Sequence, residues 1–169
     1  MVAIQSTERK VVKIQSEQVN EMSPRLNYWQ VAPEAAKRVR HVNEYLSQSS
    51  IDPLLRHLIW LRISQINGCS YCVDLHTHEA MRDGEKQQRL DCLVVWRETA
   101  FYSDKEKAAL EWAEALTDVS RTHAPDQTYD VVRKHFDDKD LVDLTLLIST
   151  MNAWNRMAIG FRRGPATRT

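Results

Sequence analysis

Apolar residues recur every three or four positions through most of this chain, the spacing of one buried face of an α-helix. Proline, acidic or hydroxyl residues precede most of these stretches, and glycines follow several of them, as helix starts and stops require. The pattern predicts helices over about 33–48, 53–66, 69–83, 85–97, 104–120, 125–136 and 138–159. Alternating strand patterns are absent except near Val11. We therefore expect an all-α fold, a bundle of six to seven helices.

Two of the helix starts carry specific signals. Asp52 followed by Pro53 is typical of an N-cap and a first helical residue. Ser103 and Glu106 have the spacing of a capping box, in which each side chain bonds the backbone of the other. The helix over 53–66 is apolar on more than one side, which indicates a position inside the bundle.

The ends of the periodic pattern set the domain organisation. Residues 1–22 lack sustained periodicity and predict a loose N-terminal arm, with a short extended segment around Val11. Residues 23–162 form the predicted helical domain, and 163–169 form a basic C-terminal tail. At 169 residues, 43% of them apolar, the chain is long enough for one well-buried core.

The charge balance and the hydropathy of the chain limit which partners and which cellular compartment we expect. Basic and acidic residues number 23 each, so no positive surplus favours nucleic acid or an anionic membrane. The N-terminus has no apolar signal-peptide core, and no apolar run is long enough to span a bilayer. We expect a cytoplasmic protein, in which a disulfide is transient and catalytic because the cytosol is reducing.

The chemistry is concentrated at the start of the central helix over 69–83. Cys69, Cys72 and His76 share one helix face, so two thiols one turn apart can close a disulfide and the imidazole can move a proton. Backbone N–H groups and the dipole at a helix start favour thiolate over thiol. This arrangement indicates a redox site.

Two other interpretations of a Cys-x-x-Cys pair are a zinc half-site and two buried apolar thiols. Cys92 is the sole further cysteine, and His76 and His78 point to different helix faces, so the spacing argues against zinc. A c-type haem needs histidine directly after the second cysteine, where Val73 stands. We therefore expect neither a metal nor a bound cofactor.

The region around the cysteines resembles the AhpD-like branch of the carboxymuconolactone decarboxylase family. The likeness covers roughly residues 30 to 162 and rests on Leu61–Gly68, Cys69-x-x-Cys72-x-x-x-His76, Gly84–Glu85, Trp96–Thr99, Leu110–Leu116, Leu141–Thr145 and Asn152–Arg156. It implies a helical subunit that assembles as a homotrimer or homohexamer. It also implies thiol-dependent alkylhydroperoxidase activity supported by an external dithiol reductant.

The resemblance also implies roles for individual residues. Cys72 attacks the peroxide, Cys69 resolves the sulfenic acid as a disulfide, and His76 relays the proton. The family has a glutamate twelve residues before the first cysteine, and this chain has His57 there. His57 and His76 lie on helices folded back at Asn67, so we expect the two imidazoles to face each other. The alternative is that His57 only satisfies a hydrogen bond in the core.

Several further residues are interpreted from their positions. Glu79 lies three residues after His76 and is placed to orient it. Tyr71 is expected to pack, with a peroxide pocket on a neighbouring subunit as the alternative. Cys92 is expected to be a buried apolar residue. Four tryptophans at helical spacing are assigned to the core and to subunit interfaces: Trp60, Trp96, Trp112 and Trp154.

Two functions follow from these observations. The first is a thiol-dependent peroxidase that reduces small organic hydroperoxides and takes electrons from a thiol reductant or a reductase protein. The second is a non-enzymatic, redox-responsive helical oligomer or binding protein that keeps the scaffold, which the replacement of the glutamate by His57 favours.

Overall fold

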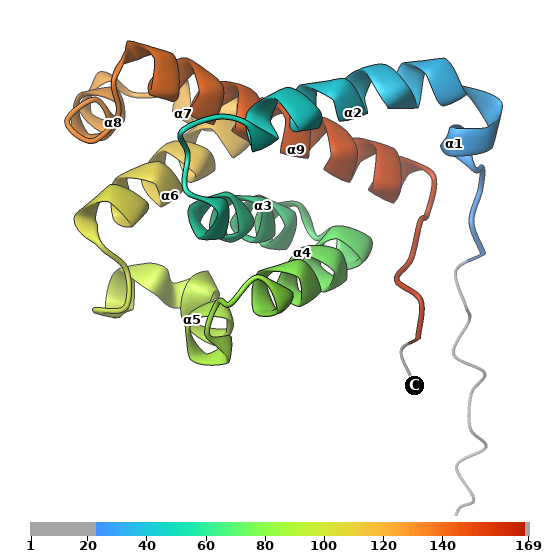
Figure 1. Cartoon of the computed structure of the whole chain (residues 1–169), viewed down its shortest axis with the longest axis horizontal. Helices are drawn as coiled ribbons and strands as arrows, with labels where there is room; N and C mark the ends of the chain where they lie inside the picture. The colour runs from blue at the N-terminus through green and yellow to red at the C-terminus, as the bar shows by residue number, and fades with distance from the viewer. Residues whose placement is uncertain (1–22, 168–169) are drawn as a thin grey trace, which may run out of the picture.

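The computed structural model describes residues 23–167, and this part of the chain is helical without any strand, which confirms the all-α prediction (Figure 1). The elements are α1 Tyr28–Val31, α2 Pro33–Ser47, α3 Pro53–Asn67, α4 Ser70–Arg82, α5 Gln87–Asp91, the 3₁₀-helix η1 Cys92–Glu98, α6 Asp104–Thr117, α7 Val119–Thr122, α8 Asp126–Val132 and α9 Asp138–Gly160. The predicted arm over 1–22 and the end of the tail at 168–169 lie outside the described residues.

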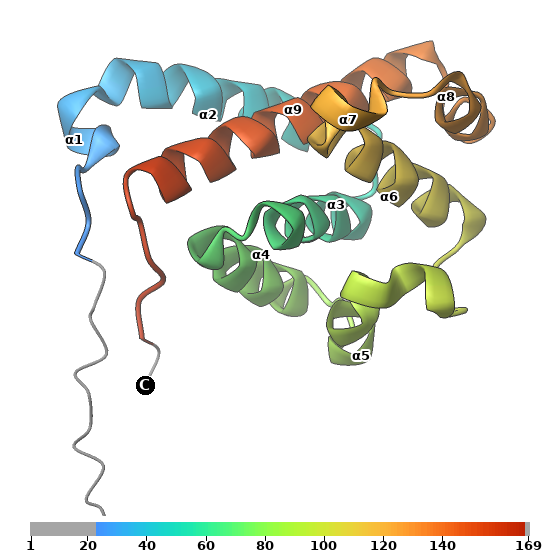
Figure 2. The same cartoon turned by 180° about the vertical axis from the view of Figure 1, so that it is seen from behind.

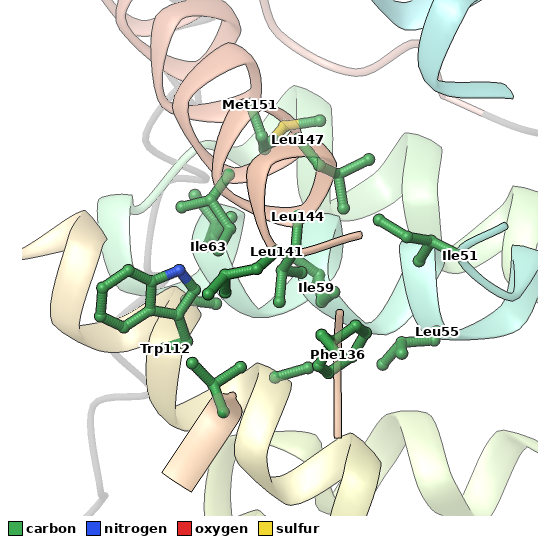
Figure 3. Close-up of a cluster of buried hydrophobic side chains, with 14 of the residues drawn as sticks. Ile51, Leu55, Ile59, Ile63, Trp112, Phe136, Leu141, Leu144, Leu147 and Met151 are labelled. Atoms are coloured by element: carbon green, nitrogen blue, oxygen red, sulfur yellow. The ribbon is translucent and has the colours of Figure 1, made fainter. Parts of the chain in front are cut away.

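Helix α3 is the centre of the bundle. It packs against α4, α6 and α9, and both views show it between α4 and α9 (Figures 1 and 2). Its side chains are buried on several faces, as its all-round apolar pattern predicts. The largest core cluster joins α3, α6 and α9, with ten members labelled in Figure 3: Ile51, Leu55, Ile59, Ile63, Trp112, Phe136, Leu141, Leu144, Leu147 and Met151.

The predicted helix starts are present in atomic detail. The Asp52 carboxylate accepts hydrogen bonds from the backbone N–H groups of Leu54 and Leu55 at 2.9 and 3.1 Å, and Pro53 is the first helical residue. Ser103 and Glu106 form the full capping box. These side chains satisfy N–H groups that a helix start leaves unpaired, which fixes where α3 and α6 begin.

The single helix predicted over 85–97 is wrong. This stretch forms α5 and then η1, with a kink at Val95 (φ −122°, ψ 30°). The physical reason is the spacing of its buried residues: Leu90, Leu93 and Trp96 are three apart, and a 3₁₀-helix with three residues per turn places all of them on one face. Cys92 falls off that face and is partly exposed, which corrects its assignment as a buried residue.

Other boundaries differ from the predicted ones by a few residues. Helix α6 ends at Thr117, because Asp118 leaves helical geometry before the short α7. Helix α8 ends at Val132 and is followed by a turn rather than continuing to Phe136. The short α1, capped by the Asn27 side chain, was not predicted.

The two ends of the described chain lie side by side. The Arg25 N–H donates a 3.0 Å hydrogen bond to the Phe161 carbonyl, and both views show the segment before α1 running beside the segment after α9 (Figures 1 and 2). This pairing brings α1 and the chain after α9 to the same side of α4, where the cysteines lie. None of the helices in residues 23–167 has the length and apolar character needed to cross a membrane.

Candidate active site

A tight turn joins α3 to α4 and sets the position of the cysteines. Gly68 adopts the left-handed conformation (φ 70°, ψ 32°), which glycine reaches without the steric cost of a Cβ atom. The next N–H group, of Cys69, donates a 2.9 Å hydrogen bond to the Ser64 carbonyl and closes the end of α3. The chain is thereby folded back, and Cys69 becomes the N-cap of α4.

Cys69 and Cys72 are free thiols in direct contact. Their sulfur atoms are 2.8 Å apart, and both residues are buried, with exposed fractions of 1% and 4%. A disulfide bond is about 2.05 Å long, so small side-chain rotations bring the sulfurs into bonding range. The predicted disulfide reach of the pair is therefore present in the reduced protein.

The two sulfurs have different acidities. The pKa of Cys69 is lowered to about 7, first because the Cys72 S–H donates to its sulfur, and also because the backbone N–H of Cys72 does so at 3.4 Å. The same contact raises the pKa of Cys72, as does burial. One ionisation of the pair thus leaves the thiolate on Cys69, which is the residue that the helix start stabilises.

Asn155 of α9 is a buried polar residue that connects the thiol pair to the turn. Its amide nitrogen donates a 3.1 Å hydrogen bond to the Ser64 hydroxyl, and its oxygen accepts one of 2.9 Å from the Asn67 amide. Its side chain also lowers the pKa of both cysteines by hydrogen bonding. No function was predicted for Asn155, because the buried face of α9 carries other polar residues as well, among them Thr150 and Asn152.

A cavity of about 180 Å³ opens next to the pair. Cys72 lines it and Cys69 does not, so a molecule in the cavity meets the Cys72 sulfur. Trp29 and Trp154 stack at a centroid distance of 5.6 Å in its wall, and Tyr71 also lines it. Trp154 therefore belongs to a cavity wall, and Tyr71 faces the cavity of its own chain.

Arg163 supplies a positive charge to this cavity. Its guanidinium lies 4.0 Å from the centroid of the Tyr71 ring and donates a 3.0 Å hydrogen bond to the Tyr28 hydroxyl. The charge also acts on the Cys72 thiol, whose pKa it lowers against the larger effect of the Cys69 contact. Arg163 lies in the predicted C-terminal tail, for which no site residue was expected.

His76 lines the same cavity and is held by Glu79. Its Nδ1 atom lies 3.1 Å from Glu79 Oε2, so Nδ1 carries the proton that the carboxylate accepts and Nε2 keeps a lone pair. Burial lowers the pKa of His76, and the Glu79 carboxylate opposes that shift. The imidazole is thus neutral near pH 7 and able to accept a proton. The predicted orienting contact from Glu79 is present.

His57 faces His76 across the α3–α4 turn, as its place in the sequence predicts. One ring nitrogen of each histidine and a Glu79 oxygen all lie within 4.8 Å of one another. His57 Nε2 makes a 2.9 Å hydrogen bond with Asp83 Oδ2, a partner that was not predicted. Its Nδ1 atom is buried and has no hydrogen-bond partner.

Comparison with known proteins adds sequence relatives to this geometry. The sequence profile of the carboxymuconolactone decarboxylase family matches residues 33–115. YdfG, an uncharacterized protein of Bacillus subtilis (strain 168), is 44% identical over 147 residues, which make up 87% of this chain and all of YdfG. The similarity to YdfG therefore extends over most of this chain.

Solved structures share the architecture. A protein of unknown function from Agrobacterium tumefaciens, ATU0492, provisionally described as the antioxidant defence protein AhpD, has a TM-score of 0.84 and 40% identity, over 86% of this chain and 100% of that one. The debrominase Bmp8 has a TM-score of 0.73 at 19% identity, over 82% of this chain and 74% of that one. Such low identity shows the fold alone, and a fold shared with a debrominase does not identify a substrate.

Proposed function

This chain belongs to the AhpD-like branch of the carboxymuconolactone decarboxylase family, and on that basis we propose that it is a thiol-dependent peroxidase for small organic hydroperoxides. The observation that carries the proposal is the pair of free sulfurs 2.8 Å apart, of which one lines a cavity. Thiols in such contact can exchange a proton and then form a disulfide without rearrangement of the fold. A structural cysteine pair has no need of access from a cavity.

The thiolate character of the pair supplies the nucleophile. The first ionisation leaves Cys69 as thiolate and Cys72 as thiol, and the proton moves from Cys72 to Cys69 across their contact when peroxide is bound. The charge then lies on Cys72, the sulfur that faces the cavity. Thiolates, not thiols, attack peroxides, so this transfer is the activating step.

Peroxide reduction proceeds through oxidation of Cys72 and then formation of the Cys69–Cys72 disulfide. The Cys72 thiolate attacks the terminal oxygen of R–O–O–H, the S–O bond forms, the O–O bond breaks, and the alkoxide leaves and takes a proton from water to give the alcohol. The Cys69 thiol then attacks the sulfur of the Cys72 sulfenic acid. The S–S bond forms, the S–O bond breaks, and the released hydroxide takes the Cys69 proton to give water. An external dithiol reduces the disulfide and restores both thiols.

His76 handles the protons of these steps. Its neutral imidazole lines the same cavity as Cys72 with Nε2 not engaged by Glu79, so Nε2 can relay a proton to the hydroxide that leaves the Cys72 sulfur. Glu79 stabilises the transient imidazolium because its carboxylate is 3.1 Å from Nδ1. Glu79 thereby takes the part of the family glutamate that His57 replaces.

The cavity favours an apolar peroxide with a polar group within reach of Arg163. Its walls are mainly aromatic and aliphatic, from Tyr28, Trp29, Tyr71, Leu75, Met151 and Trp154. At about 180 Å³ it holds a molecule of only a few carbon atoms or one ring. These properties support small organic hydroperoxides as substrates.

The test is peroxide consumption by the full chain under dithiothreitol, with cumene hydroperoxide as the probe. We expect the alcohol to form in a one-to-one ratio to the peroxide, and the protein without reductant to consume one equivalent and gain one Cys69–Cys72 disulfide. Cys92→Ser is the matched control, because Cys92 lies on η1 away from the pair, and it should react as the parent does. Consumption no faster than in the Cys69→Ser/Cys72→Ser variant would contradict the proposal and favour the non-enzymatic, redox-responsive protein.

A further inference from the structure

The side chains of His57, His76 and Glu79 form a cluster with the composition of a metal site. We propose that these three residues bind one divalent transition-metal ion, for which Zn²⁺ is the probe, beside the thiol pair. Two imidazoles and one carboxylate are a frequent donor set for zinc with a fourth position left to water. The set shares only His76 with the cysteine-based zinc site that the sequence spacing argues against.

The donor atoms are close enough to share an ion after small movements. One nitrogen from each histidine and one Glu79 oxygen lie within 4.8 Å of one another, and His76 Nδ1 and Glu79 Oε2 are already 3.1 Å apart. Zn–N and Zn–O bonds of about 2.0–2.2 Å place tetrahedral ligands roughly 3.3 Å from each other. Atoms 4.8 Å apart must therefore approach by up to about 1.5 Å, a movement to which the half-buried Glu79 side chain can contribute.

His57 is the independent sign of a missing ligand. It has an exposed fraction of only 6%, and its buried Nδ1 atom makes no hydrogen bond. A buried polar atom without a partner destabilises the folded protein, so a ligand at this atom would be favourable. Because Asp83 accepts a hydrogen bond from Nε2, the proton lies on Nε2 and the Nδ1 lone pair is free for a metal.

Asp83 completes the arrangement from outside. A histidine that binds a metal usually donates its other N–H to a carboxylate, which fixes the ring and raises its basicity, and the Asp83–His57 pair at 2.9 Å has this form. The Glu79 carboxylate offsets part of the charge of a divalent ion, whereas Asp83 is also paired with Arg82 at 2.8 Å. Trp60 packs against both imidazoles, at centroid distances of 5.6 Å to His57 and 5.1 Å to His76.

Metal binding here would stop the thiol cycle, a consequence that rests on the proposed function. Coordination through His76 Nε2 occupies the lone pair that accepts the proton. Coordination through Nδ1 displaces the proton onto Nε2, so that Nε2 becomes a donor and no longer a base. Both geometries also take the Glu79 carboxylate away from the imidazole. The ion would therefore act as a reversible inhibitor that a chelator removes.

Binding is tested without the thiols. The full-length Cys69→Ser/Cys72→Ser variant, freed of metal with a chelator, is titrated with Co²⁺ by visible absorption and with Zn²⁺ by calorimetry. We expect one ion per chain. Affinity should fall at least tenfold in His57→Gln and Glu79→Gln made in the same background, and 10–100-fold in Asp83→Asn, which removes only the outer carboxylate. His78→Gln is the matched control, an exposed histidine on the same helix, and should leave affinity unchanged.

Two results would overturn the site. One is that the double-serine variant binds no metal. If the parent binds metal and the double-serine variant does not, the thiols are the ligands. The other is a Zn²⁺ affinity in the His57→Gln, Glu79→Gln and Asp83→Asn variants that equals the affinity of the double-serine variant itself. Asp83→Asn is included because it leaves all three ligands in place, so its result does not depend on whether His57→Gln folds. Neither measurement involves peroxide, so metal binding stands or falls separately from peroxidase activity. In the parent, Zn²⁺ should slow peroxide consumption and a chelator should restore it.

Discussion

Glu79 lies 3.1 Å from His76 on the same helix, one turn further along α4. The family pattern places the corresponding carboxylate on the preceding helix, at the position of His57. Because both partners here belong to one rigid element, their contact does not depend on the packing of α3 against α4. Under the proposed function, the carboxylate that serves His76 therefore lies on α4, while His57 pairs with Asp83.

Replacing Glu79 tests this exchange. Glu79→Gln keeps an oxygen that can accept from His76 Nδ1 but removes the charge that stabilises the imidazolium. We expect the rate of Cys72 oxidation by peroxide to fall by about tenfold or more, within the range of general-base contributions. Stopped-flow tryptophan fluorescence under single-turnover conditions provides the measurement, with His78→Gln as the control. An unchanged rate would mean that His76 needs no carboxylate.

The Cys69 pKa predicts how reactivity depends on pH. This pKa lies at about 7 instead of 9.0, because the Cys72 S–H and backbone N–H stabilise the thiolate. A lowered thiol pKa means that the thiolate forms as pH rises through 7, so ultraviolet thiolate absorbance should increase there and level off near pH 8. Cys72→Ser replaces the sulfhydryl donor by a hydroxyl and keeps the backbone N–H donor to Cys69. This variant is therefore the control for the backbone contribution to the Cys69 pKa. A midpoint near 9 in the parent would contradict the assignment.

Restoring the family glutamate at residue 57 should harm this protein. Asp83 Oδ2 lies 2.9 Å from His57 Nε2, and Arg82 and His57 together hold the pKa of Asp83 at about 2. His57→Glu would place a second carboxylate against one that is ionised at neutral pH, so we expect the melting temperature to fall by a few degrees.

The double variant His57→Glu/Asp83→Asn distinguishes repulsion between the two carboxylates from loss of the packing that His57 provides. An asparagine can donate to the new glutamate, so most of the lost melting temperature should return.

The stability of the parent should also depend on pH through Asp83. A carboxyl with a lowered pKa stabilises the fold above its ordinary pKa of 3.8, and this contribution is lost as pH falls towards 2. The difference in stability between the parent and Asp83→Asn should therefore disappear as pH falls from 3.8 to 2.

Self-association is the fourth prediction. Val142 of α9 is 66% exposed, and Leu146 lies one turn further along the same face, beside a surface hollow lined by Trp112 and Tyr129. Exposed apolar residues that cluster in this way are typical of protein interfaces. We expect a homotrimer or homohexamer by analytical ultracentrifugation at micromolar concentration, and smaller species after Val142→Asp. A monomeric parent would contradict the expectation.

Local signals in the sequence were sufficient for most of the fold. Asp52, Ser103 and Gly68 act on backbone groups within four residues, so their effect can be inferred from neighbouring positions alone. The same holds for Cys69, Cys72 and His76, which share a face because of the helical repeat. The segment from Leu90 to Trp96 could not be predicted in this way, because its 3₁₀ geometry depends on which residues the rest of the core buries.

The parts of the site that sequence alone did not predict come from distant segments. Asn155 reaches the turn from α9, Arg163 reaches the cavity from beyond α9, and both are brought there by tertiary packing. Neither residue type at its position carries a local signal of chemistry. Asp83 was seen only as the end of a helix, since its distance to His57 depends on how closely α3 and α4 pack.

The contact of Asn155 with the turn has a consequence for biosynthesis. Ribosomal synthesis proceeds from the N-terminus, so α3, the turn and both cysteines emerge well before α9 exists to cover them. Until Asn155 and Ala158 dock, the nascent chain carries two uncovered thiols without the amide that helps to set their acidity. The two thiols of the newly made polypeptide therefore become covered only when its last helix has folded.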